Sequence, residues 1–411
     1  MSSLLKYQIG QIMPRIPETV ERIEPARLQE VSEAISDVVA ELAAATAKLG
    51  HALNPQTAAN LASLVRIMNT YYSNLIEGHN TRPRDIERAL AGQLDNDLER
   101  RNLQIEAAAH VRVQSEVDLM ALENRLPEPA SVDFVLWLHR EFYRDASPQM
   151  LRIQGHGAEF TMVPGTWRAK RQHDVAVGRH QPPSSDRVQD FMVHFASRYR
   201  FEHLGKAARI IAIPAAHHRF NYIHPFLDGN GRVSRLMSHA MAHLSGIGAH
   251  GLWSISRGLA RGLASPGDYR RMMDHADTPR QGDLDGRGNL SQRALSEFIL
   301  WFLRVCLDQV TFMTGLFEID ALARRLRSFV ERSEQLKPEA ARLLEEALIR
   351  GQFERGEVPR ITGLPERTAR RVFNDVSATG LLASETPKGP VSLRFPTETL
   401  DVLFPRLFPE I

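Results

Sequence analysis

The chain has 411 residues, of which 43% are hydrophobic and 24% are charged. These fractions are average for globular proteins, so the composition excludes a disordered chain and a fibrous repeat. Lysine and arginine together number 51 against 49 acidic residues, which leaves a formal net charge of +2. A charge so close to zero excludes attraction of the whole chain to nucleic acid or to an anionic membrane, so any basic patch must be local.

The single cysteine, Cys306, excludes an internal disulfide and a metal site made of several cysteines. The first ten residues lack the long apolar segment of a signal peptide. The most apolar runs, at residues 209–216 and 298–307, are shorter than a membrane span. We therefore expect a cytoplasmic protein without a membrane partner.

The first half of the chain has the apolar spacing of amphipathic helices. Residues 57–77 show this most clearly, because their apolar side chains recur every three or four positions and Gly78 follows as a stop. We predict helices over residues 25–49, 57–77, 84–94, 104–122 and 132–144.

Between residues 151 and 183 the pattern changes to glycine, proline and short alternating stretches such as residues 173–177. This pattern predicts a small β-hairpin inserted in a helical domain. Helical patterns then resume, and a polar, glycine-rich loop at residues 280–289 interrupts them. They cover residues 185–202, 205–222, 233–244 and 291–330.

The last 75 or so residues have a pattern of their own, which predicts three helices followed by a hairpin through Lys388. This order resembles a winged helix-turn-helix. Arg367, Arg370 and Arg371 lie at the start of the third helix, where a DNA-binding protein places its contacts. A winged fold used for dimerisation or protein docking is the alternative, and the sequence leaves both open. The predicted helices are residues 339–353, 358–361 and 365–378.

The most informative segment is HPFLDGNGRVSR at residues 224–235. Gly229, Asn230 and Gly231 form a predicted turn at the start of the next helix, where backbone N–H groups attract anions. Arg232 and Arg235 are three residues apart and so lie on one helix face, where their guanidinium groups can grip phosphate oxygens. The alternative for such a turn by itself is an ordinary loop before a solvated helix.

Two further residues of this segment favour catalysis on a nucleotide. Asp228 offers a hard oxygen ligand, and one carboxylate with phosphates and waters is the usual way to hold Mg²⁺. His224 is expected near the ordinary histidine pKa of about 6.5, and such a side chain is best suited to take a proton from a hydroxyl at neutral pH. The sequence contains neither a P-loop nor the protein-kinase motifs. We therefore predict a nucleoside triphosphate site of another kind.

This segment resembles the signature HPFx[D/E]GNGRxxR of the Fic (filamentation induced by cAMP) family, and every fixed position matches. The resemblance implies an enzyme that transfers AMP from ATP to Ser, Thr or Tyr hydroxyls of proteins, itself included, and releases pyrophosphate. It implies that His224 deprotonates the target hydroxyl and that Asp228 coordinates Mg²⁺. Such transfer depends mainly on positioning and charge stabilisation, which agrees with the residues present.

The resemblance also assigns the nucleotide contacts. Asn230 and the amides of Gly229 and Gly231 would hold the α- and β-phosphates, and Arg232 and Arg235 the outer phosphates. Tyr269 would line the adenine end of the nucleotide site. The alternative is that Tyr269 is a tyrosine of the protein core.

A second motif lies on the predicted helix at residues 57–77. The spacing turns Ser73 and Glu77 away from the apolar stripe of that helix, so the simplest interpretation is a solvated polar face. Ser73, Glu77 and Gly78 nevertheless match the inhibitory motif [S/T]xxxE[G/N] of the same family. The resemblance implies that Glu77 pairs with Arg235, takes the donors that the γ-phosphate needs, and repels the triphosphate.

Residues 164–178, PGTWRAKRQHDVAVG, resemble the family's flap, a hairpin whose edge pairs with the target peptide. A purely structural hairpin is the alternative. His217 and His218 invite a metal site with His224, but adjacent residues on a helix point to different sides. We expect packing or surface roles for both.

We therefore expect a mainly α protein, a Fic-type helical bundle with a small β-hairpin flap, followed by a winged-helix domain. The predicted domains are an N-terminal region with the inhibitory helix at residues 1–120, a catalytic domain at 121–335 and a winged helix-turn-helix at 336–411. The predicted function is a Mg²⁺-dependent protein adenylyltransferase inhibited by Glu77. The alternatives are a DNA-binding regulator whose Fic domain senses nucleotide, and a de-AMPylase using Glu77. A homodimer is a further expectation, because relatives commonly form dimers.

Overall fold

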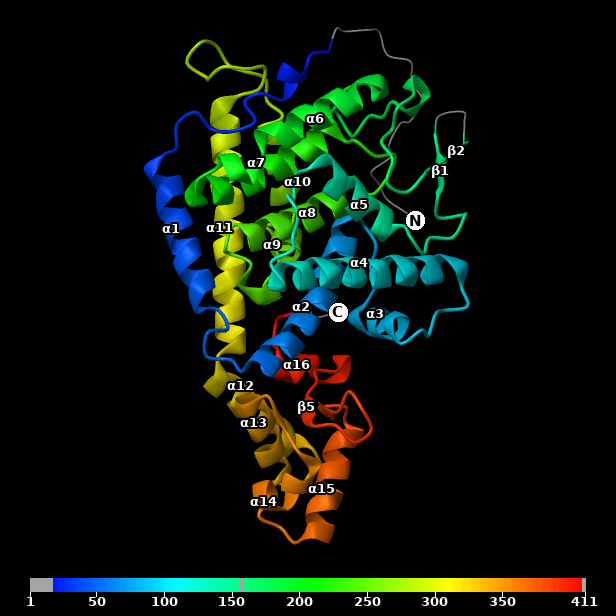
Figure 1. Cartoon of the computed structure of the whole chain (residues 1–411), viewed down its shortest axis with the longest axis vertical. Helices are drawn as coiled ribbons and strands as arrows, with labels where there is room; N and C mark the ends of the chain where they lie inside the picture. Colours follow the sequence, from blue (N-terminus) through cyan, green and yellow to red (C-terminus); the bar gives the residue numbers. More distant parts are fainter. Residues whose placement is uncertain (1–17, 156–158, 409–411) are drawn as a thin grey trace. The chain divides into compact units, whose positions relative to one another are not determined.

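The computed structural model describes residues 18–155 and 159–408, and this part of the chain is mainly helical, with two small sheets (Figure 1). It divides into two compact units. The first contains the described residues up to 44 together with 69–248 and 254–309, and the second contains 45–68, 249–253 and the described residues from 310 on. Each unit groups segments that are distant in sequence but packed together in space. The units do not test the predicted domain boundaries, which stay predictions.

Helix α8 (Asn230–Leu244) is the central element of the first unit, where it packs against α4, α5, α7 and α9 (Figure 1). The helices that lie wholly or partly in this unit mostly follow one another along the chain. They begin and end as follows: α1 Glu33–Lys48, α2 Pro55–Ile76, α3 Pro83–Leu90, α4 Leu98–Leu122, α5 Val132–Phe142, α6 Val188–Arg198, α7 Lys206–Ile223, α9 Ile255–Arg261, α10 Asp268–Ala276 and α11 Gln292–Phe317.

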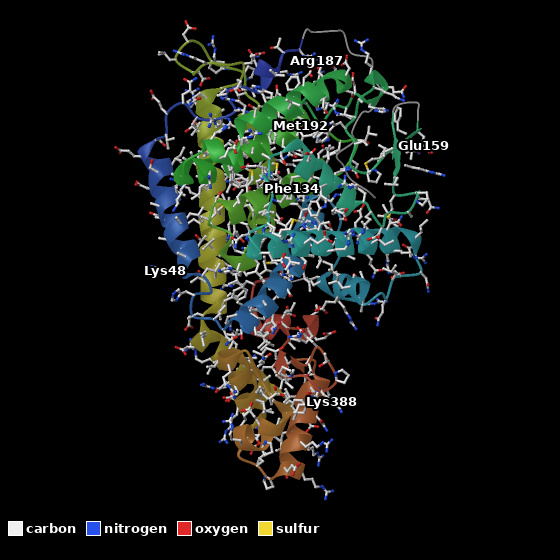
Figure 2. The ribbon with its side chains drawn as sticks, viewed as in Figure 1. Lys48, Phe134, Glu159, Arg187, Met192 and Lys388 are labelled. Atoms are coloured by element: carbon white, nitrogen blue, oxygen red, sulfur yellow. The ribbon has the colours of Figure 1, made fainter. Side chains whose placement is uncertain are left out.

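The core of this unit is built from the apolar faces of these helices. Phe134 on α5 and Met192 on α6 are buried, and Figure 2 shows both within the helical layers. Helix α8 is buried on nearly all sides, and Arg232 and Arg235 are buried with it. Because a buried charge is costly unless it is paired, these two arginines must have partners of opposite charge.

Helix α2 forms close to the predicted range of 57–77. It begins at Pro55, which is well suited to a first helical position, and the side chain of Asn54 accepts a hydrogen bond from the Gln56 N–H over 3.0 Å. It ends before Gly78, whose φ of 88° is a left-handed conformation that glycine adopts without strain. Helix α1, by contrast, begins at Glu33 and not at the predicted residue 25, because Ser32 caps it through its carbonyl and hydroxyl oxygens.

The inserted hairpin is present, but it lies upstream of the predicted strand. Strands β1 (Arg152–Gln154) and β2 (Glu159–Thr161) pair antiparallel, with Ile153 opposite Phe160. The predicted strand at residues 173–177 is wrong, because this stretch begins in a short 3-10 helix and makes only an isolated bridge from Val177 to His180. The alternation there reflects buried Val175 between polar neighbours.

The second unit contains most of the C-terminal elements. The predicted helices at 358–361 and 365–378 and the hairpin are present, but the predicted helix at 339–353 ends early, because Gly351 turns the chain at a φ of 81° into a strand. The strands form an antiparallel sheet in the order β3-β5-β4. The elements are α12 Ile319–Arg332, α13 Ala340–Arg350, β3 Gln352–Phe353, α14 Val358–Thr362, α15 Glu366–Ala378, β4 Leu382–Ala383, β5 Val391–Leu393 and α16 Leu400–Leu403.

Short 3-10 helices connect several of these elements. They are η1 Val20–Ile23, η2 Arg171–His173, η3 Ser185–Arg187, η4 Phe201–His203, η5 Ala249–Gly251, η6 Arg355–Glu357 and η7 Thr397–Thr399.

Helix α11 is long and apolar enough, by length and composition alone, to cross a membrane. Its apolar side chains, among them Leu295, Phe298 and Phe302, are buried inside the protein. Core helices commonly meet the same length and hydropathy criteria, so this helix is weak evidence for a membrane span.

Candidate functional site

The segment at residues 224–235 forms a tight loop between α7 and α8. His224 ends α7 in the left-handed conformation, with φ of 50° and ψ of 62°, and Gly229 precedes α8 at a φ of 80°. A side chain at Gly229 would strike the ring of Tyr143, because a Cβ there would lie 2.8 Å from the Tyr143 hydroxyl oxygen. Glycine is thus required at this position for both its φ and its small size. The loop directs the N-terminus of α8 into the predicted phosphate site.

Arg168 holds the backbone around His224. Its Nε donates to the carbonyl oxygen of His224 over 2.7 Å, and one Nη donates to that of Ile223 over 3.0 Å. Its backbone N–H also donates to the carbonyl of Pro225 over 3.0 Å. Arg168 is 1% exposed, so these bonds form away from water. A non-glycine residue in the left-handed region is strained, and these bonds offset that strain.

The imidazole of His224 is neutral at physiological pH. Burial, together with the charge of Arg168 and the influence of His180, lowers the pKa of His224 to about 3. The sequence-based expectation of a pKa near 6.5 is therefore wrong for the ligand-free protein. A neutral imidazole can still accept a proton, as a general base must.

Asn230 is occupied within the loop itself. Its side-chain oxygen accepts from the N–H of Phe226, and its side-chain NH₂ donates to the Phe226 carbonyl, both over 2.9 Å. These two bonds close the loop between His224 and α8. The amide side chain, predicted to contact phosphate, thus holds the backbone that would do so.

Arg232 lies between two carboxylates. One Nη donates to Glu106 on α4 over 2.6 Å, and the other donates to Asp228 over 3.0 Å. The guanidinium carbon lies 5.1 Å from the centre of the Phe142 ring, a cation–π distance. The Tyr143 hydroxyl donates to the same Asp228 oxygen over 2.7 Å. Both terminal nitrogens of Arg232 are therefore engaged without a phosphate.

Asp228 remains ionised in this setting. Burial raises the pKa of Asp228, but the charge of Arg232 and the hydrogen bond from Tyr143 outweigh it and place this pKa below its usual range. Its side chain is 30% exposed. An ionised, accessible carboxylate beside a helix N-terminus is a donor of the kind that Mg²⁺ takes together with phosphates and waters. The residues present therefore fit the predicted ion.

Arg235 joins the two predicted motifs. Its Nη2 lies 2.6 Å from Oε1 of Glu77, and its Nε donates to the hydroxyl oxygen of Ser73 over 2.9 Å. Arg235 is 1% exposed and Ser73 is completely buried. The simpler interpretation of Ser73 and Glu77 as a solvated face is therefore wrong, because both side chains turn toward α8.

Glu77 also lies against the helix N-terminus. A Cβ on Gly231 would overlap Oε1 of Glu77, so the absence of a side chain at Gly231 lets the carboxylate approach the first turn of α8. This is the position where the positive end of a helix attracts an anion. The carboxylate thus occupies a place that suits a phosphate.

Tyr269 reaches the same cluster from α10. Its hydroxyl lies 2.8 Å from Nε2 of His217, and the other ring nitrogen of His217 lies 2.9 Å from the Ser238 hydroxyl. Burial raises the pKa of Tyr269 to about 12. Its ring stacks on Trp301 with an interplanar angle of 17°. Its predicted contact with adenine stays a prediction.

The two adjacent histidines separate as expected. His217 faces Ser238 and Tyr269, whereas His218 faces Asp277, with Nε2 of His218 and the carboxylate 3.2 Å apart. Both are completely buried, and among the residues that the structure describes neither belongs to a metal-ligand group with His224. Packing roles explain both.

Sequence reasoning missed Arg168, Glu106, Tyr143 and His139. His139 stacks on Phe226 at a centroid distance of 3.8 Å, and its Nδ1 accepts from the Gly165 N–H over 2.8 Å. All four act across distances of dozens of residues, so no local motif marks them. Glu106 and His139 lie on helices, and Arg168 and Tyr143 lie outside them, so each shows only a polar side chain of a kind that many surface residues share.

The central region of the chain is similar to known proteins. Residues 129–242 match the model of the Fic/DOC family. A stretch of 100 residues, 23% of this chain, is 32% identical to a protein adenylyltransferase Fic from Drosophila erecta and 34% identical to one from Drosophila virilis. That stretch is 18% and 19% of those proteins, so the chain matches less than a fifth of the length of these curated relatives.

The fold has a counterpart among solved structures. The crystal structure of a Fic family protein from Desulfovibrio desulfuricans G20 superposes with a TM-score of 0.50 at 17% identity, over 90% of this chain and 98% of that chain. The chain therefore carries a Fic domain, and its mainly helical fold is that of a Fic-family structure.

Proposed function

We propose that this protein is a Mg²⁺-dependent protein adenylyltransferase that transfers AMP from ATP to protein hydroxyls and is inhibited by its own Glu77. The Fic domain and the relatives named protein adenylyltransferase support this reaction class. The observation that carries the inhibitory part is the pair of Glu77 and Arg235, 2.6 Å apart, at the N-terminus of α8.

The chemistry rests on the loop at residues 224–235. The neutral imidazole of His224 accepts the proton of a Ser, Thr or Tyr hydroxyl, whose oxygen forms a bond to the α-phosphorus of ATP while the bond to the β-phosphate oxygen breaks. Pyrophosphate leaves with that electron pair. The phosphates bring negative charge close to His224, which raises its pKa from about 3 toward a value that suits a general base.

The N-terminus of α8 and its arginines stabilise the phosphates. Backbone N–H groups after Gly229 point along the helix axis toward the anion, where no reorganisation is needed during the reaction. Asp228 would hold Mg²⁺, which when bound neutralises and orients the triphosphate. Arg232 exchanges its bond to Asp228 for phosphate oxygens and stays anchored by Glu106.

Glu77 opposes this binding in two ways. Its carboxylate takes a guanidinium donor of Arg235 and places a negative charge in the anion site. Two like charges within about 4 Å repel by about 4 kcal/mol at an effective dielectric constant of about 20. ATP therefore binds productively only when Glu77 leaves.

The reaction is tested by incubating the full chain with α-labelled ATP and Mg²⁺ and measuring label on protein. Glu77→Gly should carry at least tenfold more label than the wild type, and Glu77→Gly with His224→Ala should carry none. Glu123→Gly is the matched control, because Glu123 also follows the last residue of a helix but pairs with Arg125 far from the loop. No label on any variant would contradict the transferase, and equal label on Glu77→Gly and Glu123→Gly would contradict the inhibition.

A second activity is favoured by α15 of the second unit. Arg367, Arg370 and Arg371 are exposed at the start of this helix. We propose that these side chains contact DNA phosphates and bases, as the predicted winged helix would. Binding to a DNA duplex should fall as salt rises, and Arg370→Ala should lower the magnitude of the salt slope by about 1. Unchanged binding by Arg370→Ala, or no binding by the wild type at low salt, would instead favour a protein-docking role.

A further inference from the structure

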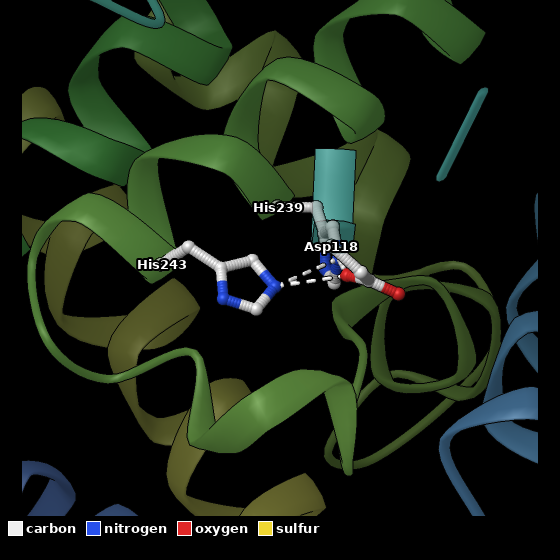
Figure 3. A group of neighbouring side chains, drawn as sticks. All are labelled: Asp118, His239 and His243. Atoms are coloured by element: carbon white, nitrogen blue, oxygen red, sulfur yellow. Dashed lines mark hydrogen bonds and ion pairs between the residues drawn. The ribbon is translucent and has the colours of Figure 1, made fainter. Parts of the chain in front are cut away.

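A second cluster of charged side chains lies further along α8. His239 and His243 are one helical turn apart and meet Asp118, which reaches them from α4 (Figure 3). Oδ1 of Asp118 lies 2.6 Å from Nε2 of His239 and 2.9 Å from Nε2 of His243. The two Nε2 atoms are 3.2 Å apart. Three potential ligand atoms thus converge on one point.

The size of this triangle matches the coordination shell of a small cation. A tetrahedral Zn²⁺ ion with bonds of about 2.0–2.1 Å separates its ligand atoms by about 3.3 Å. Two of the distances here, 2.6 and 2.9 Å, are shorter than that by about 0.7 and 0.4 Å, and the third, 3.2 Å, nearly equals it. Small side-chain rotations therefore suffice to admit an ion.

The residue spacing also suits a metal. Histidines at positions i and i+4 of a helix lie on one face and form a common zinc-binding pair, completed by a carboxylate from elsewhere. The three side chains are 9%, 6% and 8% exposed, so they are held in place by packing and largely shielded from water. Among the described residues, this is the group of three or more His, Cys, Asp or Glu side chains whose ligand atoms all approach within 4.8 Å.

Hydrogen bonding alone explains the geometry of this cluster less completely than a bound cation does. Both Nε2 atoms approach the same carboxylate oxygen and also each other. If both nitrogens carry protons, two N–H groups lie in contact and repel. If one nitrogen is unprotonated, its lone pair faces the carboxylate oxygen. A cation between the three atoms satisfies all three lone pairs at once.

We propose that Asp118, His239 and His243 bind a divalent transition-metal ion of the zinc class, which fastens α4 to α8. Two imidazoles and one carboxylate suit Zn²⁺ and not Mg²⁺, which takes oxygen ligands. The site is separate from the predicted Mg²⁺ ligand Asp228 and does not depend on the proposed transferase activity. It would stiffen the helix pair that also carries Glu106 and Arg232.

Zinc binding is measured on the full chain after metal is removed with a chelator. Titration of the wild type with ZnCl₂ against a chromophoric chelator should show one tightly bound equivalent, and a large excess of Mg²⁺ should not displace it. His243→Ala and Asp118→Asn should each bind that equivalent at least tenfold more weakly. His275→Ala is the matched control, because His275 pairs with a single carboxylate, Glu297, at 2.7 Å on the surface, and it should bind as the wild type does.

Thermal unfolding separates loss of the site from loss of the fold. Zn²⁺ should raise the melting temperature of the wild type and of His275→Ala but not that of His243→Ala, relative to each protein in chelator. If His243→Ala does not fold, the visible spectrum of Co²⁺ in the wild type decides instead, since a four- or five-coordinate ion absorbs far more strongly than an octahedral one. Absence of a bound equivalent in the wild type, equal affinity in all variants, or an octahedral Co²⁺ spectrum would overturn the proposal.

Discussion

The two ends of α8 carry charged clusters of opposite design. At the N-terminal end, Arg232 and Arg235 are buried cations held by carboxylates around a glycine-lined turn. At the C-terminal end, one carboxylate gathers two imidazoles around a common point. The first arrangement is suited to exchange a carboxylate for a phosphate, and the second to accept a cation. Under the two proposals, one buried helix would serve two ligands of opposite charge, because arginines lie at its N-terminal end and a carboxylate with two imidazoles at its C-terminal end.

The largest expected effect comes from a variant that breaks the N-terminal cluster. Arg232→Ala leaves the carboxylates of Glu106 and Asp228 without their shared cation, and breaking a buried pair costs about 3–5 kcal/mol. The free energy of unfolding in urea should fall by that amount. Arg125→Ala, which breaks an exposed pair with Glu123, should change it by at most about 1 kcal/mol. Similar losses in the two variants would show that the buried cluster is no more tightly coupled than a surface pair.

Acidification tests the buried, neutral histidines around α8 and the loop that precedes it. Burial lowers the pKa of His139 to about 4 and, together with nearby charges, those of His217 and His224 to about 3, against 6.5 when unfolded. The unfolded chain therefore binds more protons below pH 6.5, and stability is lost as the pH falls. For three such groups the loss between pH 7 and pH 6 is about 2 kcal/mol.

Urea unfolding at these two pH values measures this loss. His217→Gln should reduce it by about 0.7 kcal/mol, the contribution of one such group, because the glutamine does not titrate. An unfolding free energy that stays constant from pH 7 to pH 6 would contradict the burial of neutral imidazoles here.

The smallest expected effect concerns the support of Arg235. Ser73→Ala removes the hydroxyl that accepts from Nε of Arg235, and a hydrogen bond to a charged group contributes about 1.5 kcal/mol. Stability should fall by that amount, whereas Ser63→Ala on the exposed face of the same helix should be neutral. A neutral Ser73→Ala would mean that Glu77 and the carbonyl of residue 73 hold Arg235 without the hydroxyl.

The sequence predicted those parts of the site that lie close together along the chain. The turn at Gly229 follows from glycine chemistry, and helix periodicity placed Ser73 and Glu77 outside the apolar stripe of α2. Their partner Arg235, 158 residues from Glu77, came only from the family resemblance. Residue spacing could not predict this pairing, because no local sequence pattern shows which helices pack together.

The errors have the same origin. The pKa of His224 depends on Arg168 and on burial, neither of which is visible in the loop's own sequence. The strand predicted at residues 173–177 was a local alternation without a paired neighbour, and a strand needs one. The cluster of Asp118 with His239 and His243 went unnoticed because the aspartate lies 121 residues from the first histidine.

Competition between Glu77 and ATP for Arg235 is the central claim, and an affinity measurement tests it most directly. The His224→Ala background prevents turnover, so calorimetric titration with ATP and Mg²⁺ reports binding alone. In that background Glu77→Gln, which keeps the side-chain shape without its charge, should bind ATP at least tenfold more tightly than the protein with Glu77. Glu123→Gln should leave the affinity unchanged. Equal ATP affinity with glutamate and glutamine at position 77 would contradict the account.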